Sequence, residues 1–507
     1  MSNKTIILIS FIALKFLLQY ILISPEYELQ RDEYLHLDQA NHLAWGYLSV
    51  PPFTSWNSYI IQLLGNSVYW IKFFPALFGA LTIVIVWKSI EVLNGSLFAL
   101  VLGATCVLFS VLLRVNTLYQ PNSYDILSWT ILYFILIKYI KSENPKWLFI
   151  GAAMFALAFL NKYNIVFLLF GLIPALLFSE HRKIFLQPKL YLAIVFGLII
   201  ITPNLLWQYA NGFPVFHHLK VLSETQLVNV DRVGFLKSQI LFFIGSIFVL
   251  VASWYALLFY TPFSKYKLFL LSILFTLITF LFFRAKDYYA IGIYPIYISF
   301  GSVYLGEILK DGWKKYLQPV AIVLPVLSFI PMYQFVFPNR SPSYIVEHAE
   351  YYKKLGLLRW EDGKDHLIPQ DFADMLGWKE LAKKVDGVYS SLPNKQKTLL
   401  LCDNYGQAGA INYYTRQNIR AVSFNADYID WFDLTINYEN LIRVKEQSDM
   451  NLEFEETAPF FHHSILADSI SNQHAREYGT LIYSFTKAKI DITQRIIEEI
   501  NEKKIKR

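Results

Sequence analysis

Long apolar runs recur along the first two thirds of the chain and stop near residue 338. A helix needs about 20 apolar residues to cross a bilayer. By this rule about eleven runs predict membrane-spanning helices. They lie near 5–24, 68–91, 96–114, 123–141, 147–160, 163–179, 189–207, 237–260, 266–283, 288–309 and 316–336.

We divide one apolar stretch into two helices at Asn161 and Lys162. This division fixes the orientation of all later segments in the membrane, because a single merged helix would reverse that orientation. Positive charge supports the division, since cytoplasmic loops are enriched in lysine and arginine. With the N-terminus in the cytoplasm, the cytoplasmic loops carry Lys138, Lys141, Lys146, Arg182, Lys183, Lys189, Lys265, Lys267, Lys310, Lys314 and Lys315. Loops 25–67, 115–122, 208–236 and 284–287, and the chain after 338, are then expected on the outer face.

Composition agrees with this picture. Charged residues make up 17% of the chain, against about 25% in soluble domains, and the deficit lies before residue 338. We therefore predict a polytopic α-helical membrane protein, with a transmembrane domain over 1–338 and a soluble α/β domain over 339–507. Within the first, loop 25–67 is amphipathic in part and predicts short helices lying on the membrane surface.

The tail carries clear local signals. Leu381, Val385, Val388 and Leu392 recur at helical spacing, so 377–392 predicts an amphipathic helix. The stretch TLLLCDNYGQAGAINYYT predicts a buried strand, a turn at Asn404 to Gly406, and a helix. The two cysteines, Cys106 and Cys402, are too few for a cysteine-ligated zinc site. A nucleic-acid partner is not expected, because no basic stripe with interleaved aromatics occurs.

Asp32 and Glu33 follow the first apolar run directly, in RDEYLHLDQANHLAWGYLSVPP. Charges beside hydrocarbon are costly and usually have a task or a partner. One interpretation is a general base that removes a proton from an acceptor hydroxyl or amine. The alternative is the start of a surface helix, where acids are favoured in the first turn.

Asp125 stands in YQPNSYD, at the outer start of another predicted span. It either complements the dipole of that helix or converges with Asp32 on one cleft. In the second case it would position an arginine, a substrate group or a metal.

Two places put basic residues on the outer face, against the positive-inside bias. One is Lys162 with Tyr163, in FLNKYN. The other is the stretch with Arg284, Lys286, Tyr288 and Tyr289. Both are candidates for binding a lipid-linked phosphate, although a lysine that snorkels to the interface would explain Lys162 equally well.

The outer-loop histidines are His36, His42, His217 and His218. Their spacing matches no zinc motif such as HExxH, so a structural or substrate-contacting role is expected for His36 and His42. No Walker sequence, Rossmann glycine fingerprint or serine nucleophile elbow occurs.

The stretches RDEYLHLDQANHLAWGYLSVPP, YQPNSYD, GAAMFALAFLNKYN and AKDYYAIGIYP resemble, in this order, bacterial members of the dolichyl-phosphate-mannose protein mannosyltransferase superfamily. That superfamily includes the lipid A aminoarabinose transferases. The tail stretches DFADMLGWKELAKKV and DNYGQAGAINYYT are similar to the outer domain of many such proteins.

The resemblance implies a GT-C glycosyltransferase that takes a sugar from a polyisoprenyl-phosphate carrier and inverts the anomeric carbon. It implies that Asp32 is the base, Glu33 its companion and Asp125 the second outer-loop acid. Lys162 and the stretch 284–289 match regions that face the donor phosphate. The implied location is the cytoplasmic membrane of a bacterium, and the implied acceptor is a lipid, a glycan or a protein.

The chain departs from the family pattern at two points. The aminoarabinose transferases have a lysine near the proline of the first outer loop, and SVPPFTSW has none, which gives more weight to Lys162, Arg284 and Lys286. The Asp-x-Asp motif that holds a metal in the oligosaccharyl relatives is also missing. Metal-independent catalysis without a cofactor is therefore expected, and use of a divalent metal is the alternative.

Other functions stay open at this point. A transporter or a lipid-linked-glycan flippase is the main alternative, but it would show two related halves and acids within its spans. A membrane-anchored binding protein and a glycan polymerase or ligase of another fold are two more.

Overall fold

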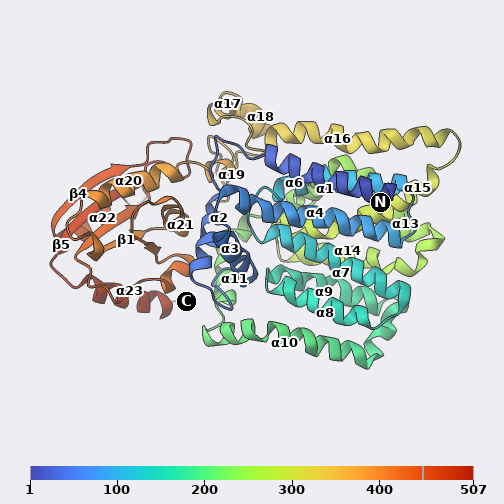
Figure 1. Cartoon of the computed structure of the whole chain (residues 1–507), viewed down its shortest axis with the longest axis horizontal. Helices are drawn as coiled ribbons and strands as arrows, with labels where there is room; N and C mark the ends of the chain where they lie inside the picture. The colour runs from blue at the N-terminus through green and yellow to red at the C-terminus, as the bar shows by residue number, and fades with distance from the viewer. Residues whose placement is uncertain (1, 448–449, 506–507) are drawn as a thin grey trace.

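The computed structural model describes residues 2–447 and 450–505. Apolar helices form a bundle at one end, and a smaller region with a five-stranded sheet lies at the other (Figure 1). The bundle helices are α1 (Asn3–Ile21), α4 (Val68–Val92), α5 (Leu97–Leu108), α6 (Val111–Val115), α7 (Asn122–Ser142), α8 (Lys146–Phe159), α9 (Val166–Leu177), α10 (Pro188–Ala210), α12 (Arg232–Phe242), α13 (Ile247–Phe259), α14 (Leu268–Phe282), α15 (Tyr294–Ile308) and α16 (Leu317–Val336).

The protein is a multi-pass membrane protein. Among the described residues, five helical stretches are long and apolar enough to cross a bilayer: α1, α4, α7, α10 and Gly312–Val336. Two bent pairs raise the number to seven if each is one span. They are Tyr163–Leu177 with Glu180–Leu186, bent by 109°, and Arg232–Phe242 with Ile244–Phe259, bent by 63°.

Each of the predicted apolar runs contains a helix, but several helices are shorter than the run. The run 96–114 is an example, because α5 stops at Leu108 and the Ser110 side chain caps the separate helix α6. At about 1.5 Å per residue, the 12 residues of α5 are shorter than a bilayer core of about 30 Å. The total of about eleven spans therefore stays a prediction.

The break at Asn161 and Lys162 is confirmed. Helix α8 ends at Phe159, and the 3-10 turn η2 (Tyr163–Ile165) precedes α9. The loops that follow α7, α9, α13 and α15 all lie at the end of the bundle remote from the sheet (Figure 1). The basic residues of the positive-inside pattern lie in these loops or in the helix ends beside them, so the helical arrangement groups them on one side.

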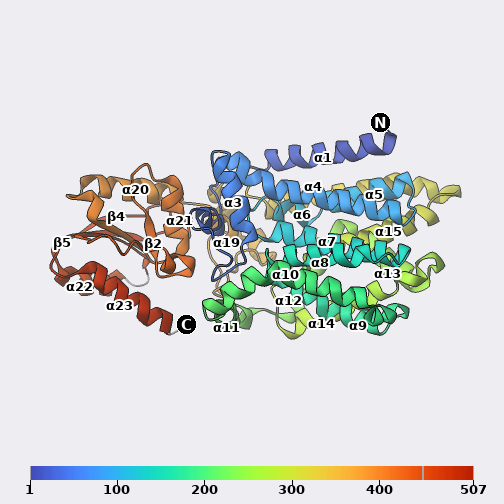
Figure 2. The same ribbon diagram turned by 60° about the horizontal axis from the view of Figure 1, so that its bottom comes forward.

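Short helices lie at the junction between the bundle and the sheet (Figure 1). They are α2 (Arg31–Asp38), α3 (Phe53–Leu63), α11 (Pro214–Thr225), α17 (Pro342–Glu347), α18 (Ala349–Lys354) and α19 (Gln370–Ala373). Of these, α3, α11 and α19 can also be followed in Figure 2. The short helices expected in loop 25–67 are present. However, α2 is not a surface helix, because every residue from Glu33 to Asp38 is buried.

The apolar side chains of α2 explain its burial. Tyr34, Leu35 and Leu37 share one core with Trp378 and Leu400 of the following region. The amphipathic pattern that predicted contact with a membrane surface is thus satisfied by contact with protein.

We call the elements from residue 378 to 505 the sheet region. Helices cover both faces of its sheet. Its elements are α20 (Trp378–Ser391), β1 (Thr398–Cys402), α21 (Tyr405–Tyr414), β2 (Ala421–Ser423), β3 (Asn440–Lys445), α22 (Met450–Thr457), β4 (Phe461–Ser469), β5 (Leu481–Ala488) and α23 (Ile492–Ile505). The strand order is β2-β1-β3-β5-β4, with β2, β1 and β3 parallel and β5 and β4 antiparallel.

Strand β1 shows why the sheet is covered on both faces. Successive side chains of a strand point to opposite faces. Leu400 and Cys402 pack in the core shared with α20, α21 and α2, whereas Leu399 and Leu401 pack in the core that contains the apolar residues of α23. The predicted helix over 377–392 and the strand, turn and helix after it are confirmed as α20, β1 and α21.

Gly409 offers a test of the contact between α21 and α2. A Cβ added there would lie 2.8 Å from Tyr34 Cβ and 2.8 Å from the Tyr428 hydroxyl. We expect Gly409→Ala to force the two helices apart and to destabilise the protein by about 1–3 kcal/mol, as overpacking does. Thermal unfolding of the detergent-solubilised protein measures this.

Gly387→Ala is the matched control. Gly387 is also helical, in α20, but nothing lies within 4 Å of an added Cβ. Alanine there should leave the melting temperature unchanged or raise it slightly, because alanine favours a helix over glycine by up to about 1 kcal/mol. An equal melting temperature for both variants would contradict the close contact.

Candidate active site

A cavity of about 810 Å³ lies at the junction of α2, the bundle and the sheet region. Its walls come from distant parts of the sequence, including α2, the turn before α7, the break after α8, α11, the 3-10 turn η7 (Asp287–Ile293), α21 and α23. The lining side chains that could bind a substrate or transfer a proton are Asp32, His36, Gln120, Asn122, Lys162, His217, His218, Lys286, Tyr288, Tyr289, Tyr405, Asp430 and Lys504.

Asp32 lies in the first turn of α2 and lines this cavity. The Tyr405 hydroxyl donates to its Oδ1 at 2.7 Å, and the Gln120 amide donates to its Oδ2 at 3.1 Å. One donor comes from the sheet region and the other from the bundle, so the carboxylate is oriented from two sides. Each carboxylate oxygen has two acceptor positions, so the group can still accept a proton.

Glu33 is fully buried and does not line the cavity. Lys72 Nζ on α4 donates to both of its oxygens, at 2.6 and 2.8 Å. The backbone N–H groups of Tyr119 and Gln30 donate to it at 2.6 and 2.7 Å. These bonds use about all the acceptor positions of a carboxylate. The expected role of Glu33 as companion of the base is therefore corrected: it fixes α2 to the bundle.

Asp125 is buried near the start of α7, outside the cavity wall. Its oxygens accept the Trp129 indole N–H at 3.2 Å and the Asn164 amide at 2.9 Å. The predicted convergence of Asp125 and Asp32 on one cleft is not found. Helix α7 presents Asn122 to the cavity instead, and Asp125 anchors the turn that carries Lys162.

Lys162 is the cation at the break between α8 and α9. Its Nζ donates to Asn122 Oδ1 at 2.7 Å and lies 4.4 Å from the ring centre of Tyr289 and 5.2 Å from that of Tyr288. Burial lowers the pKa of Lys162 to about 8, although nearby Asp125 acts in the opposite direction. The lysine is therefore charged near neutral pH and becomes neutral in mildly alkaline solution.

Lys286 and Arg284 lie close in sequence but differ in position. Lys286 lines the cavity and pairs with Glu361 at 2.8 Å. Arg284 is exposed, has a positive φ of 51°, and donates to the Val228 carbonyl at 3.3 Å. The expected clamp of Arg284 with Lys286 is therefore wrong for Arg284, which does not reach the cavity.

Of the remaining predicted site residues, some line the cavity and others lie outside it. His36 is buried and lines the cavity, and burial lowers its pKa. His42 is exposed and stacks on Trp431 with ring centres 4.2 Å apart, outside the cavity. Tyr163 binds Asn204 and Gln208 through its hydroxyl, also outside it. The structure therefore brings His36, but not His42 or Tyr163, to the cavity.

Four polar residues of this centre were not predicted from the sequence: Lys72, Gln120, Asn122 and Tyr405. Lys72 had a usable signal, because a lysine inside an apolar run is costly and normally has a partner. Gln120 and Asn122 stand beside Asp125 in the same short motif and could have been weighed with it. Tyr405 had no signal, since only the folded chain brings position 405 to position 32.

Within the described residues, no three histidine, cysteine, aspartate or glutamate side chains group closely enough to hold a metal ion. Cys106 and Cys402 are both buried and free.

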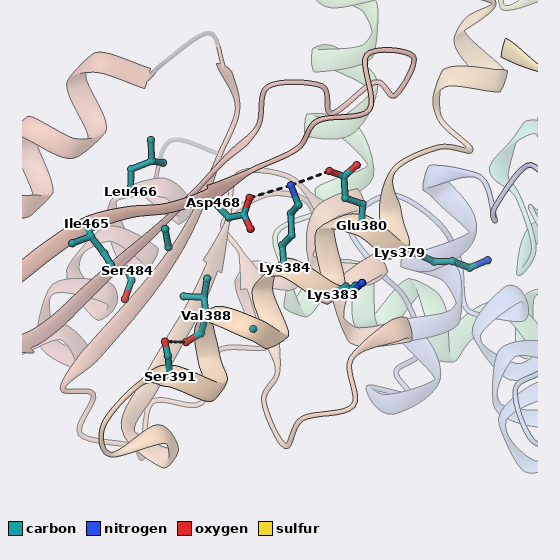
Figure 3. Close-up of a pocket in the computed structure, with 12 residues that line it drawn as sticks. Lys379, Glu380, Lys383, Lys384, Val388, Ser391, Ile465, Leu466, Asp468 and Ser484 are labelled. Carbon is teal, nitrogen blue, oxygen red and sulfur yellow. Dashed lines mark hydrogen bonds and ion pairs between the residues drawn. The ribbon is translucent and has the colours of Figure 1, made fainter. Parts of the chain in front are cut away.

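A second depression, of about 800 Å³, lies between α20 and strands β4 and β5 (Figure 3). Lys384 reaches across it to Glu380 and Asp468, at 3.0 Å from each. These are its two lining carboxylates, and Lys384 forms an ion pair with each of them. The depression offers no free base, so the cavity at Asp32 is the candidate active site.

Known proteins share this architecture. Residues 49–207 match the family model described as dolichyl-phosphate-mannose-protein mannosyltransferase. The crystal structure of ArnT from Cupriavidus metallidurans bound to undecaprenyl phosphate matches with a TM-score of 0.61 and 13% identity, over 95% of this chain and 98% of that chain. The apo structure of the same ArnT matches with a TM-score of 0.61 and 14% identity over the same shares.

The resemblance to the protein mannosyltransferase superfamily is confirmed over residues 49–207. The mannosyltransferase match includes Lys72, Asn122 and Lys162 but begins after Asp32. At such low identity the ArnT structures establish the GT-C fold and nothing finer. No curated protein matches the sequence.

The buried pair of Glu33 and Lys72 gives a stability prediction. Removing one member leaves the other charge buried and uncompensated, which costs about 3–5 kcal/mol. We expect Lys72→Met and Glu33→Gln each to lower the melting temperature strongly in detergent. The double variant should melt above both single variants, because neither charge is left alone. Additive losses in the double variant would show that the two groups do not interact.

Proposed function

We propose that the protein is an inverting glycosyltransferase that moves a sugar from a polyisoprenyl-phosphate carrier to an acceptor. The observation that carries this proposal is a carboxylate and two lysines on the walls of one cavity: Asp32, Lys162 and Lys286. The cavity lies at the ends of apolar helices, where a lipid-linked donor can place its head group. The shared fold with an ArnT that binds undecaprenyl phosphate supports a carrier of this class.

In this proposal Lys162 and Lys286 bind the donor phosphate. Transfer breaks the bond between the anomeric carbon and the phosphate oxygen, and the electron pair leaves with the phosphate. Fixed cations stabilise this developing charge more than they stabilise the ground state. The hydroxyls of Tyr288 and Tyr289 on the same wall supply further donors.

Asp32 acts as the base. The acceptor oxygen or nitrogen attacks the anomeric carbon from the face opposite the phosphate, and its proton passes to the Asp32 carboxylate. A single displacement of this kind inverts the configuration. The acceptor is a lipid, a glycan or a protein, and the reaction takes place on the outer face of a bacterial cytoplasmic membrane, with residues 339–507 on that side.

The proposed reaction needs no metal, because lysines can neutralise the leaving phosphate. Chelation with EDTA should leave transfer unchanged. A loss of transfer that Mg²⁺ or Mn²⁺ restores would replace this part of the proposal with metal-assisted transfer.

Asp32→Asn tests the base. We expect transfer from a polyprenyl-phosphate sugar in proteoliposomes to fall by about 10²–10⁴-fold, the usual contribution of a positioned base. The control is Asp365→Asn, which removes an exposed carboxylate paired with Lys353 and should retain full activity. Full transfer by a well-folded Asp32→Asn protein would refute the assignment.

The pKa of about 8 for Lys162 predicts a pH dependence of donor use. The ammonium is charged below this pH and neutral above it, so kcat/KM for the donor should fall as the pH rises through about 8. Lys162→Arg should remove this decline, because arginine stays charged. Lys162→Met should lower kcat/KM about 10- to 100-fold at neutral pH, as expected for loss of a charge-assisted hydrogen bond.

Lys383→Met is the matched control for these lysine variants. Lys383 lines the depression of Figure 3 and not the active-site cavity. Its replacement should leave the pH profile intact. An unchanged alkaline decline in Lys162→Arg would assign that decline to another group.

A further inference from the structure

Tyr405 reaches from the sheet region to the proposed base. It is the first residue of α21, which Asp403 and Asn404 connect to β1, and its hydroxyl donates to Asp32 Oδ1 at 2.7 Å. The Arg31 guanidinium lies 4.4 Å from the centre of its ring. Tyr405 also lines the active-site cavity. One aromatic side chain of the sheet region thus contacts two consecutive residues of α2.

The backbone that carries Tyr405 is held firmly. Asn404 caps α21 by accepting the Gln407 N–H at 3.0 Å, and its amide donates to Glu446 at 2.7 Å and to Glu477 at 3.1 Å. The Gln407 amide donates to Glu477 at 2.6 Å. These bonds connect the first turn of α21 to the sheet, so the Tyr405 hydroxyl has a fixed position relative to the sheet region.

Glycine permits the close approach of this turn to α2. A Cβ at Gly406 would lie 2.6 Å from Arg31 Cγ, which no real side chain tolerates. Together with Gly409, which contacts Tyr34, this leaves α21 in direct contact with the first two turns of α2. The position of Tyr405 relative to Asp32 is therefore set in part by the close packing of α21 against Arg31 and Tyr34.

Orientation is the requirement that this arrangement meets. A base is effective only if its acceptor oxygen is held within hydrogen-bond reach of the proton it takes. Asp32 has two rotatable side-chain bonds, and Gln120 restrains one oxygen only. The Tyr405 hydroxyl restrains the other, and a hydrogen bond to a carboxylate also favours its ionised form.

We propose that Tyr405 is a positioning residue for Asp32, so that the sheet region completes the active site that the bundle begins. This inference rests on the proposed function, because it takes Asp32 as the base. It gives the sheet region a direct part in catalysis, in addition to any part in binding the acceptor.

Tyr405→Phe is the decisive variant, because it keeps the ring under Arg31 and removes only the hydroxyl. We expect kcat to fall about 10- to 100-fold, the range for a hydrogen bond to a charged group, while KM for the donor changes less than twofold. The lysines that would bind the donor do not contact Tyr405, which explains the unchanged KM.

The pH profile supplies a readout that a purely structural role would not change. Arg31, His36, Tyr288, Asp374 and Tyr405 are titratable groups that interact electrostatically with Asp32. Phenylalanine at 405 removes a donor to the ionised carboxylate and leaves the other four in place. The pH at which kcat falls on the acidic side of its pH profile should therefore be higher in Tyr405→Phe than in the wild type.

Tyr413→Phe is the matched control. Tyr413 lies on the same helix, and its hydroxyl also crosses the junction, donating to the Asn66 carbonyl at 3.1 Å. It does not line the active-site cavity. We expect Tyr413→Phe to have the kcat of the wild type and the same fall of kcat at low pH.

The outcomes separate the two proposals. A wild-type protein that transfers no sugar from any polyprenyl-phosphate donor refutes the proposed function. The proposal for Tyr405 is then refuted as well, because it depends on that function. An active wild type whose kcat and fall of kcat at low pH are unchanged in Tyr405→Phe overturns the inference alone. Equal losses of activity and melting temperature in both tyrosine variants would also overturn it, because they would show a contact that matters only for folding.

Discussion

The ion pair of Lys72 and Glu33 is the interaction on which the junction depends. Burying two charges is costly, and the cost is offset only when geometry is good and the remaining acceptors are satisfied. Glu33 meets both conditions through Lys72 and two backbone N–H groups. The same contacts tie α2 to α4 and to the turn before α7. Asp32 is adjacent to Glu33, so the position of the proposed base follows from this buried pair.

The active-site cavity is therefore built from three parts with separate supports. Helix α2 supplies Asp32 and is fixed by Lys72. The bundle supplies Lys162, whose turn is anchored by Asn164 on the buried Asp125. The sheet region supplies Tyr405 from a turn tied to Glu477. Glu33 and Asp125, which looked catalytic in the sequence, instead make these supporting contacts.

Much of the fold could be predicted from the sequence, because its signals are local. Apolar runs gave the positions of the bundle helices, and the break at Lys162 and the helix at Trp378 were both expected from nearby residues. The candidate site was predicted in part: Asp32, His36, Lys162, Lys286, Tyr288 and Tyr289 line one cavity. The failures concern side-chain direction and distant partners. Nothing local distinguishes Asp32, which faces the cavity, from Glu33, which faces Lys72, and no local pattern turns Arg284 away from Lys286.

The hydrogen bond between Asp32 and Tyr405 joins residues 373 positions apart. Contacts that close such long loops cost more chain entropy and form late in folding. During synthesis, the apolar helices can therefore insert in the membrane well before the ribosome has made position 405. A nascent or prematurely terminated chain would carry the carboxylate and the lysines without the tyrosine. The site would thus be complete only after the first part of the sheet region has been synthesised.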